Sequence, residues 1–161
     1  MSRPLWMPVA QRSAKPVVLV PAGVLCPPQR IRRVLLPLDG MARSAAAVAE
    51  TAERLARGGA ELVVLHVFTA GTVPKFWDQP AHAGKAWSEE FLARHCPLPG
   101  ARLELRRGTG AEQVAKVAAA DQADMIIVAW SQRLGPGRAA AVRRAVRDAE
   151  VPVMLIPIPA G

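Results

Sequence analysis

Short apolar segments alternate with single helix-forming segments from residue 34 to the end of the chain, and this alternation constrains the fold more than any other feature. Most of the apolar segments carry hydrophobic side chains at successive positions, so both faces of each strand must be buried. Strands of that kind pair in parallel, with helices covering both sides of the sheet. The predicted strands are residues 34–38, 62–68, 102–106, 125–129 and 152–156.

Helix-forming segments fill the intervals between these strands, and Thr109 with Glu112 has the residue types and spacing that predict a capping box at the start of one of them. The sequence therefore predicts an α/β fold, namely a doubly wound, five-stranded parallel sheet with helices on both faces. Ligands bind such sheets beyond the carboxyl ends of the strands, near Asp39, Val67 and the segment after Ala129. The predicted helices are residues 41–57, 82–94, 111–120 and 138–149.

Residues 1–29 differ in composition from the rest of the chain. Six prolines occur among them, and proline excludes a long helix because it lacks a backbone donor and fixes φ. One short segment, residues 17–20, is β-branched and apolar like a buried strand. We therefore divide the chain into a proline-rich basic arm at residues 1–29, with one short strand, and a domain at residues 30–161.

The net charge of +8 belongs mostly to the front of the chain. Six of the 21 Lys and Arg residues precede Asp39, the first of 13 acidic residues, so the domain itself is nearly neutral. A basic arm suits the phosphate backbone of nucleic acids. Nucleic-acid binding through the arm is therefore kept as an alternative function, although the nearly neutral domain disfavours a nucleic-acid partner.

Cysteine content and hydropathy exclude several classes of protein. Cys26 and Cys96 lie far apart and form no C-x-x-C pair, which indicates neither a disulfide framework nor a zinc site. No apolar run approaches the roughly 20 residues needed to span a bilayer. The apolar stretch at 17–26 is interrupted by proline and glycine, unlike a signal peptide. We expect a reduced, cytoplasmic protein without a membrane segment or a metal site.

Four segments of the domain are similar, in order and spacing, to the signature segments of the universal stress protein family. They are VLLPLDG at 34–40, LHV at 65–67, ADMIIV at 123–128 and VPVMLIP at 151–157. The resemblance covers the chain from residue 30 to the end. It implies the strand order 3-2-1-4-5, counted within the domain, a homodimer formed through the last strand, and a role in the stress response.

Many members of that family bind ATP, and the resemblance implies which residues would do so here. An aspartate after the first strand and the backbone of a strand-two valine hold the adenosine end, and Asp39 and Val67 match them. A glycine-rich segment with the spacing G-x2-G-x9-G-[ST] cradles the phosphates. In this chain Ala129 and Gln132 replace its first two glycines, and residues 139–140 are Ala-Ala where Gly-Ser is expected.

This departure weakens the phosphate cradle, because glycine lets backbone N–H groups approach a phosphate and tolerates positive φ. Gln132 also brings bulk into the phosphate path. Binding of ATP or another adenine nucleotide, and the loss of that binding, both stay open as interpretations. Groups that suit an anion do remain after the fourth strand, namely Ser131, Gly135, Gly137 and Arg138.

Several candidate residues also have structural explanations. Asp39 is equally suited to capping the helix that follows it. His66 lies on a strand without a second ligand at metal spacing, which is typical of a core histidine. Trp87 and Phe91 are four residues apart and share a helix face. Core packing explains this pair, and a cover over the site or a surface for a partner is the alternative.

No catalytic constellation occurs in the sequence. The first hypothesis is therefore a non-catalytic binding or regulatory protein of the universal stress type with an eroded adenine-nucleotide site. It would act as a homodimer on an unidentified protein partner, with a phosphate-bearing ligand modulating that contact. The second hypothesis is a functional adenine-nucleotide binder with weak ATPase activity, and the third is nucleic-acid binding through the arm.

The arm contains one segment, PVVLVPAG at 16–23, that is similar to PVMLIP at 152–157. It resembles the last strand of a universal stress domain placed just before the first strand of another. We hypothesise that it pairs with the edge of the last strand, within the chain or across a dimer, and so masks an aggregation-prone edge. The alternative is a disordered arm with a chance apolar stretch.

Overall fold

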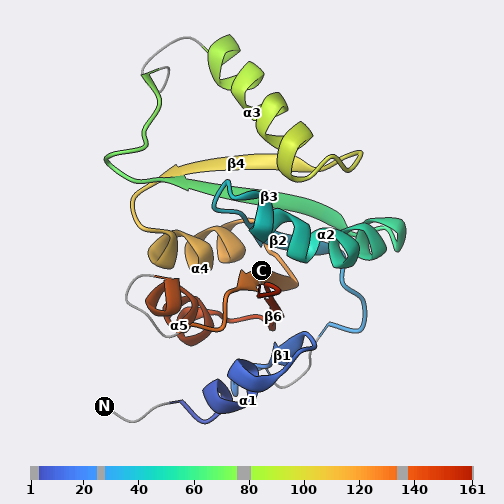
Figure 1. The fold of residues 1–161 in the computed structure, drawn as a ribbon. Helices are drawn as coiled ribbons and strands as arrows, with labels where there is room; N and C mark the ends of the chain where they lie inside the picture. The colour runs from blue at the N-terminus through green and yellow to red at the C-terminus, as the bar shows by residue number, and fades with distance from the viewer. Residues whose placement is uncertain (1–3, 25–27, 76–80, 134–137, 161) are drawn as a thin grey trace.

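The computed structural model describes residues 4–24, 28–75, 81–133 and 138–160 (Figure 1). Helices and strands alternate along most of the chain, and the strands gather into one sheet. In chain order the elements are α1 Trp6–Arg12, β1 Val17–Leu19, β2 Arg33–Pro37, α2 Ala42–Arg57, β3 Glu61–Phe68, α3 Ala81–His95, β4 Arg102–Arg107, α4 Gly110–Ala120, β5 Met125–Trp130, α5 Arg138–Asp148 and β6 Val153–Pro157.

Within the described residues the sheet has six strands, in the order β1-β6-β5-β2-β3-β4. Five of them run parallel to their neighbours, and β1 pairs antiparallel with β6. The predicted number of five strands is therefore wrong. The five parallel strands, with β2 counted as strand one, do follow the predicted order 3-2-1-4-5.

The sixth strand, β1, comes from the proline-rich arm. Val17 pairs with Leu155 and Leu19 pairs with Val153 along the outer edge of β6. The hypothesis that the arm pairs with the last strand within the chain is thus confirmed. β1 has only three residues and is preceded by Pro16. The local pattern of so short a segment does not assign it to a sheet, so the strand count predicted from the sequence omitted it.

A short helix, α1, precedes β1 in the proline-rich arm, where the sequence had predicted only a short strand. Pro8 is the third residue of this helix. The first four N–H groups of a helix have no partner within it, so a proline at this position removes no hydrogen bond. The prolines exclude a long helix, as predicted, but they permit this one of seven residues.

Two hydrophobic clusters fill the two faces of the sheet. Helices α1, α4 and α5 contribute to the first cluster, and α2 and α3 contribute to the second. The central strand β2 serves both, because Leu35 points into the first cluster while Val34 and Leu36 point into the second. Figure 1 shows α3 and α1 at opposite ends of the sheet, beside the edge strands β4 and β1.

Charged side chains join the amino ends of β2, β3 and β4. Glu61 accepts hydrogen bonds from Nε of Arg33 at 2.7 Å and from Nε of Arg102 at 2.9 Å. Arg102 also forms an ion pair of 3.2 Å with Asp121. The guanidinium of Arg102, followed by that of Arg33, lowers the pKa of the Glu61 carboxyl. This network ties three strands together at the end of the sheet opposite the cavity described next.

Candidate functional site

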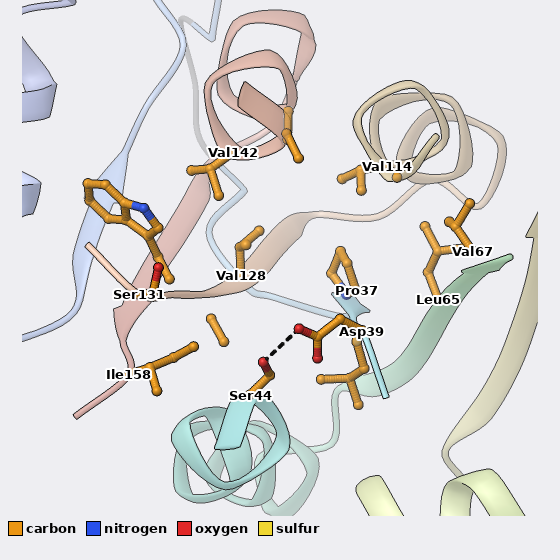
Figure 2. A pocket seen from close by; sticks show the side chains of 16 residues that line it. Pro37, Asp39, Ser44, Leu65, Val67, Val114, Val128, Ser131, Val142 and Ile158 are labelled. Carbon is orange, nitrogen blue, oxygen red and sulfur yellow. Dashed lines mark hydrogen bonds between the residues drawn. The ribbon is translucent and has the colours of Figure 1, made fainter. Parts of the chain in front are cut away.

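A cavity of about 200 Å³ lies at the carboxyl ends of β2, β3 and β5 (Figure 2). The first turn of α2 and parts of α4 and α5 complete its walls. Most of the lining is apolar, with Asp39, Ser44 and Ser131 as the polar side chains near its rim. The larger apolar lining residues are Leu38, Leu65, Val67, Val114, Val128, Trp130, Val142 and Ile158.

The order of the strands explains why the cavity forms at this point. From β2 the chain passes through α2 on one face of the sheet to reach β3, whereas from β5 it passes through α5 on the other face to reach β6. The loops at the carboxyl ends of β2 and β5 therefore diverge. This is the topological switch point at which doubly wound sheets bind ligands.

Asp39 follows β2 directly and stands at the rim of the cavity. Its Oδ1 accepts a hydrogen bond from the backbone N–H of Met41 at 3.0 Å, and its Oδ2 accepts one from Oγ of Ser44 at 3.1 Å. The side chain thus contacts the residue just before α2 and the third residue of the helix. Met41 is the N-cap of α2 and no side chain caps the helix, so the predicted capping role of Asp39 is wrong in detail. Figure 2 shows the carboxylate directed toward Ser44, and both residues line the cavity.

Three of the predicted site residues meet at this cavity, because Asp39, Val67 and Ser131 all line it. Val67 and Ser131 lie at opposite sides of it in Figure 2. Gly135 and Gly137 lie outside the described residues. Arg138 begins α5, and its side chain is likewise outside the described part of the chain.

Gln132 has a different role from the one predicted for it. Its side chain does not line the cavity; its Nε2 donates hydrogen bonds to the carbonyl oxygens of Ala10, at 2.9 Å, and Ser13, at 2.7 Å. The backbone of Gln132 keeps a left-handed conformation, with φ of 61°. Glycine adopts this conformation without strain. Gln132 thus has the backbone conformation expected of the glycine that the family motif places here, but it carries a long side chain.

Two residues of the site were missed by the sequence interpretation. Ser44 is 5% exposed and orients Asp39; its spacing of five residues from Asp39 was the available signal. Trp130 is 3% exposed, lines the cavity, and has an indole N–H without a hydrogen-bond partner.

A second cavity, of about 350 Å³, lies on the other side of Asp39, between β3 and α3. Aromatic rings pack against one another there, with Trp87 and Phe91 stacked at a centroid distance of 5.1 Å. His66 contacts Phe91 and uses its Nδ1 to bond the carbonyl oxygen of Leu38 at 2.8 Å. These contacts agree with core packing as the explanation for Trp87 and Phe91.

Two kinds of feature are absent from the described residues. None of the helices there is long and apolar enough to cross a bilayer. No group of three or more His, Cys, Asp or Glu side chains in that part of the chain is placed to hold a metal ion.

The fold is that of a doubly wound α/β domain with a cavity at its switch point. Within that class the chain belongs to the universal stress protein family, because the sequence model of that family matches residues 30–157. A sequence comparison with curated proteins finds no match.

Solved structures share the fold at low sequence identity. A universal stress protein in complex with cAMP has a TM-score of 0.59 at 18% identity, covering 81% of this chain and 100% of that one. The universal stress protein from Archaeoglobus fulgidus in complex with dAMP has a TM-score of 0.52 at 16% identity, covering 78% of this chain and 97% of that one. At these identities the likeness concerns the fold alone.

A longer protein matches more of this chain. A functionally unknown protein from Pseudomonas aeruginosa has a TM-score of 0.71 at 14% identity and covers 97% of this chain. This chain spans 57% of that protein's length. Because the match covers nearly all of this chain, it extends beyond the domain into the α1–β1 region.

Proposed function

We propose that this protein is a non-catalytic binding protein whose cavity takes the adenosine part of an adenine nucleotide, with an altered phosphate end. The observation that carries the proposal is the apolar cavity at the switch point, with Asp39 at its rim. The two similar structures that contain cAMP and dAMP support this class of ligand.

The chemistry of the lining suits a nucleoside. Apolar side chains such as Val67, Val114 and Val128 present surfaces on which a purine base can be buried. Asp39 lines the cavity, and a carboxylate is an acceptor that suits ribose hydroxyls. The hydroxyl of Ser131 adds a hydrogen-bonding group at the far wall.

The residues around the end of β5 support the proposal that the phosphate-binding end of the site is altered. Ala129 and Gln132 replace the two glycines that a phosphate cradle of this family would use first. The amide of Gln132 is bonded to the carbonyl oxygens of α1 instead of facing the cavity. Sites for drug-sized ligands usually measure about 300–1,000 Å³, and this cavity is smaller. We therefore expect a nucleoside or monophosphate to bind at least as tightly as ATP.

Calorimetric titration of the full chain with adenosine, AMP and ATP tests this function. We expect saturable binding of adenosine and AMP, with ATP no tighter, and at least about tenfold weaker binding for Asp39→Ala, since it loses a charged acceptor. Asp148→Ala, remote from the cavity, is the matched control and should bind like the unaltered chain. Tenfold tighter binding of ATP than of adenosine would refute the altered phosphate end, and no binding of any of the three would refute the function.

The homodimer through the last strand stays a prediction. It requires the outer edge of β6, with which β1 pairs in this structure, so β1 would first have to leave that edge. Light scattering on the full chain over a range of concentrations tests it. A dimer that persists on dilution supports the prediction, and a monomer at all concentrations counts against it.

A further inference from the structure

Residues 6–19, which comprise α1 and β1 and are called the N-terminal segment below, dock onto the domain at three places. β1 extends the sheet through its pairing with β6. On α1, Met7 is 2% exposed and Ala10 is 3% exposed. The third contact is polar, and it is made by Gln132 from the segment after β5.

In the contact made by Gln132, each N–H of the side-chain amide has one backbone carbonyl oxygen as its acceptor. A side-chain amide carries two N–H donors, and Nε2 of Gln132 bonds two carbonyl oxygens, those of Ala10 and Ser13. The last four carbonyl groups of a helix have no partner within it, and these two lie at the end of α1 and at its C-cap. Gln132 therefore satisfies backbone acceptors that α1 itself leaves open.

The left-handed backbone of Gln132 is a second observation that points to a positioning role for this residue. A φ of 61° is strained for a residue with a Cβ, and such strain persists only where the surroundings impose it. The two hydrogen bonds to the N-terminal segment provide that compensation. The hydrogen bonds therefore stabilise both the docked N-terminal segment and the left-handed backbone of Gln132.

The same residues continue into the wall of the cavity. Trp130 and Ser131, which precede Gln132, line the cavity. Trp6 of α1 packs edge-on against Trp130, with the ring centroids 6.1 Å apart. Ala10 belongs to the same hydrophobic cluster as Val142, another lining residue. A contiguous set of contacts therefore connects α1 to the cavity.

We propose that Gln132 is a positioning residue that makes the N-terminal segment part of the ligand site, so that docking of the segment and binding of a nucleoside stabilise each other. The coupling with a ligand rests on the proposed function. Linkage makes the effect reciprocal: an occupied cavity holds the segment in place, and a released segment weakens binding.

Hydrogen exchange of the full chain tests the docking without any ligand. Gln132→Glu keeps the shape but places a carboxylate oxygen against two carbonyl oxygens, and we expect residues 9–19 to exchange about tenfold faster at neutral pH. Their protection should partly return below pH 4.3, about where a free Glu side chain protonates and regains a donor. A structural defect of another kind would not recover in this way.

Two further variants separate the hydrogen bonds from backbone strain. Gln132→Gly removes the strain together with the donors, and we expect it also to speed exchange of residues 9–19. Gln122→Glu is the matched control, because Gln122 also has a left-handed φ, of 52°, and is exposed and remote from the N-terminal segment. If Gln132→Glu exchanges like Gln122→Glu, the positioning role of Gln132 is refuted.

Adenosine is the probe for coupling. In the unaltered chain, saturating adenosine should slow exchange of residues 9–19, and Gln132→Glu should bind adenosine about fivefold more weakly. Equal affinities in the two chains would refute the coupling while leaving the proposed function intact. Absence of adenosine binding in both chains would refute the function and the coupling, whereas the exchange rates without ligand would still decide whether Gln132 holds the N-terminal segment.

Discussion

The carboxylate of Asp39 has its orientation set by neighbours that lie close in sequence. Met41 donates a backbone N–H to one carboxylate oxygen and Ser44 donates its hydroxyl to the other. Ser44 is buried, so its hydroxyl has been taken out of water and depends on this partner. One short stretch of chain therefore both leads into α2 and presents an oriented acceptor at the cavity.

Replacing Ser44 by alanine should lower the free energy of unfolding by about 1–2 kcal/mol, because a buried hydrogen bond to a charged group is lost. Urea denaturation measures this loss. Ser88→Ala is the control, since the Ser88 hydroxyl only bonds the carbonyl oxygen of Gly84 one helical turn earlier; it should change stability by less than about 0.5 kcal/mol. Equal effects for the two substitutions would contradict the role given to Ser44.

At the scale of secondary structure, β2, β3 and β4 are joined at their amino ends by charges as well as by their ladders. Glu61 lies between Arg33 and Arg102 and bonds both. Its pKa is lowered, with the hydrogen bond from Arg102 as the largest cause. The folded state therefore binds the ionised form of Glu61 more strongly than the unfolded chain does.

This network predicts a pH dependence of stability. A carboxyl whose folded pKa is depressed contributes stability above its unfolded pKa, and that contribution is lost as the pH falls through the folded pKa. Glu61→Gln should therefore be less stable than the unaltered chain at pH 7, by about 0.5–1 kcal/mol given the partial exposure of the pair. The two should converge as the pH falls through the lowered pKa of Glu61, which lies below the ordinary glutamate value of 4.5.

Glu50→Gln is the matched control, because Glu50 pairs with Arg54 on an exposed helix surface. Thermal unfolding from pH 7 to pH 3 should give nearly parallel curves for Glu50→Gln and the unaltered chain. A difference for Glu61→Gln that stays constant over the whole range would contradict the assignment to ionised Glu61.

At the scale of the whole molecule, the N-terminal segment is part of the hydrophobic core. Ala10 shares a cluster with α4, α5, β5 and β6, and β1 covers the edge of β6. An uncovered strand edge exposes a row of backbone donors and acceptors that can pair with other chains. We therefore expect the segment and the domain to unfold together in one transition.

Met7→Ala tests this expectation, since Met7 is fully buried on α1. The substitution should lower the free energy of unfolding by about 2–4 kcal/mol, because a buried side chain is truncated and leaves a cavity. Val9→Ala, on the exposed side of the same helix, should cost less than about 0.5 kcal/mol. Urea unfolding followed by circular dichroism measures both, and a neutral Met7→Ala would mean that the segment is not part of the cooperative unit.

Local pattern predicted the parallel part of the sheet and directed attention to three residues that line the cavity. Val34, Leu35 and Leu36 lie next to one another, and a run of adjacent apolar residues requires burial on both faces. The alternation of such runs with helices then leaves few topologies, because connections are short and right-handed. Asp39, Val67 and Ser131 followed from the rule that ligands bind at the carboxyl ends of the strands.

Only the tertiary structure decided what the N-terminal segment and Gln132 do. Gln132 bonds Ala10 and Ser13, which precede it in the chain by 122 and 119 positions. No local sequence pattern carries information over that distance. The same holds for Trp130, whose place at the cavity and against Trp6 depends on how α1 packs. Periodicity determines which faces of a segment are buried, whereas the partner of each face is set by the packing of the whole chain.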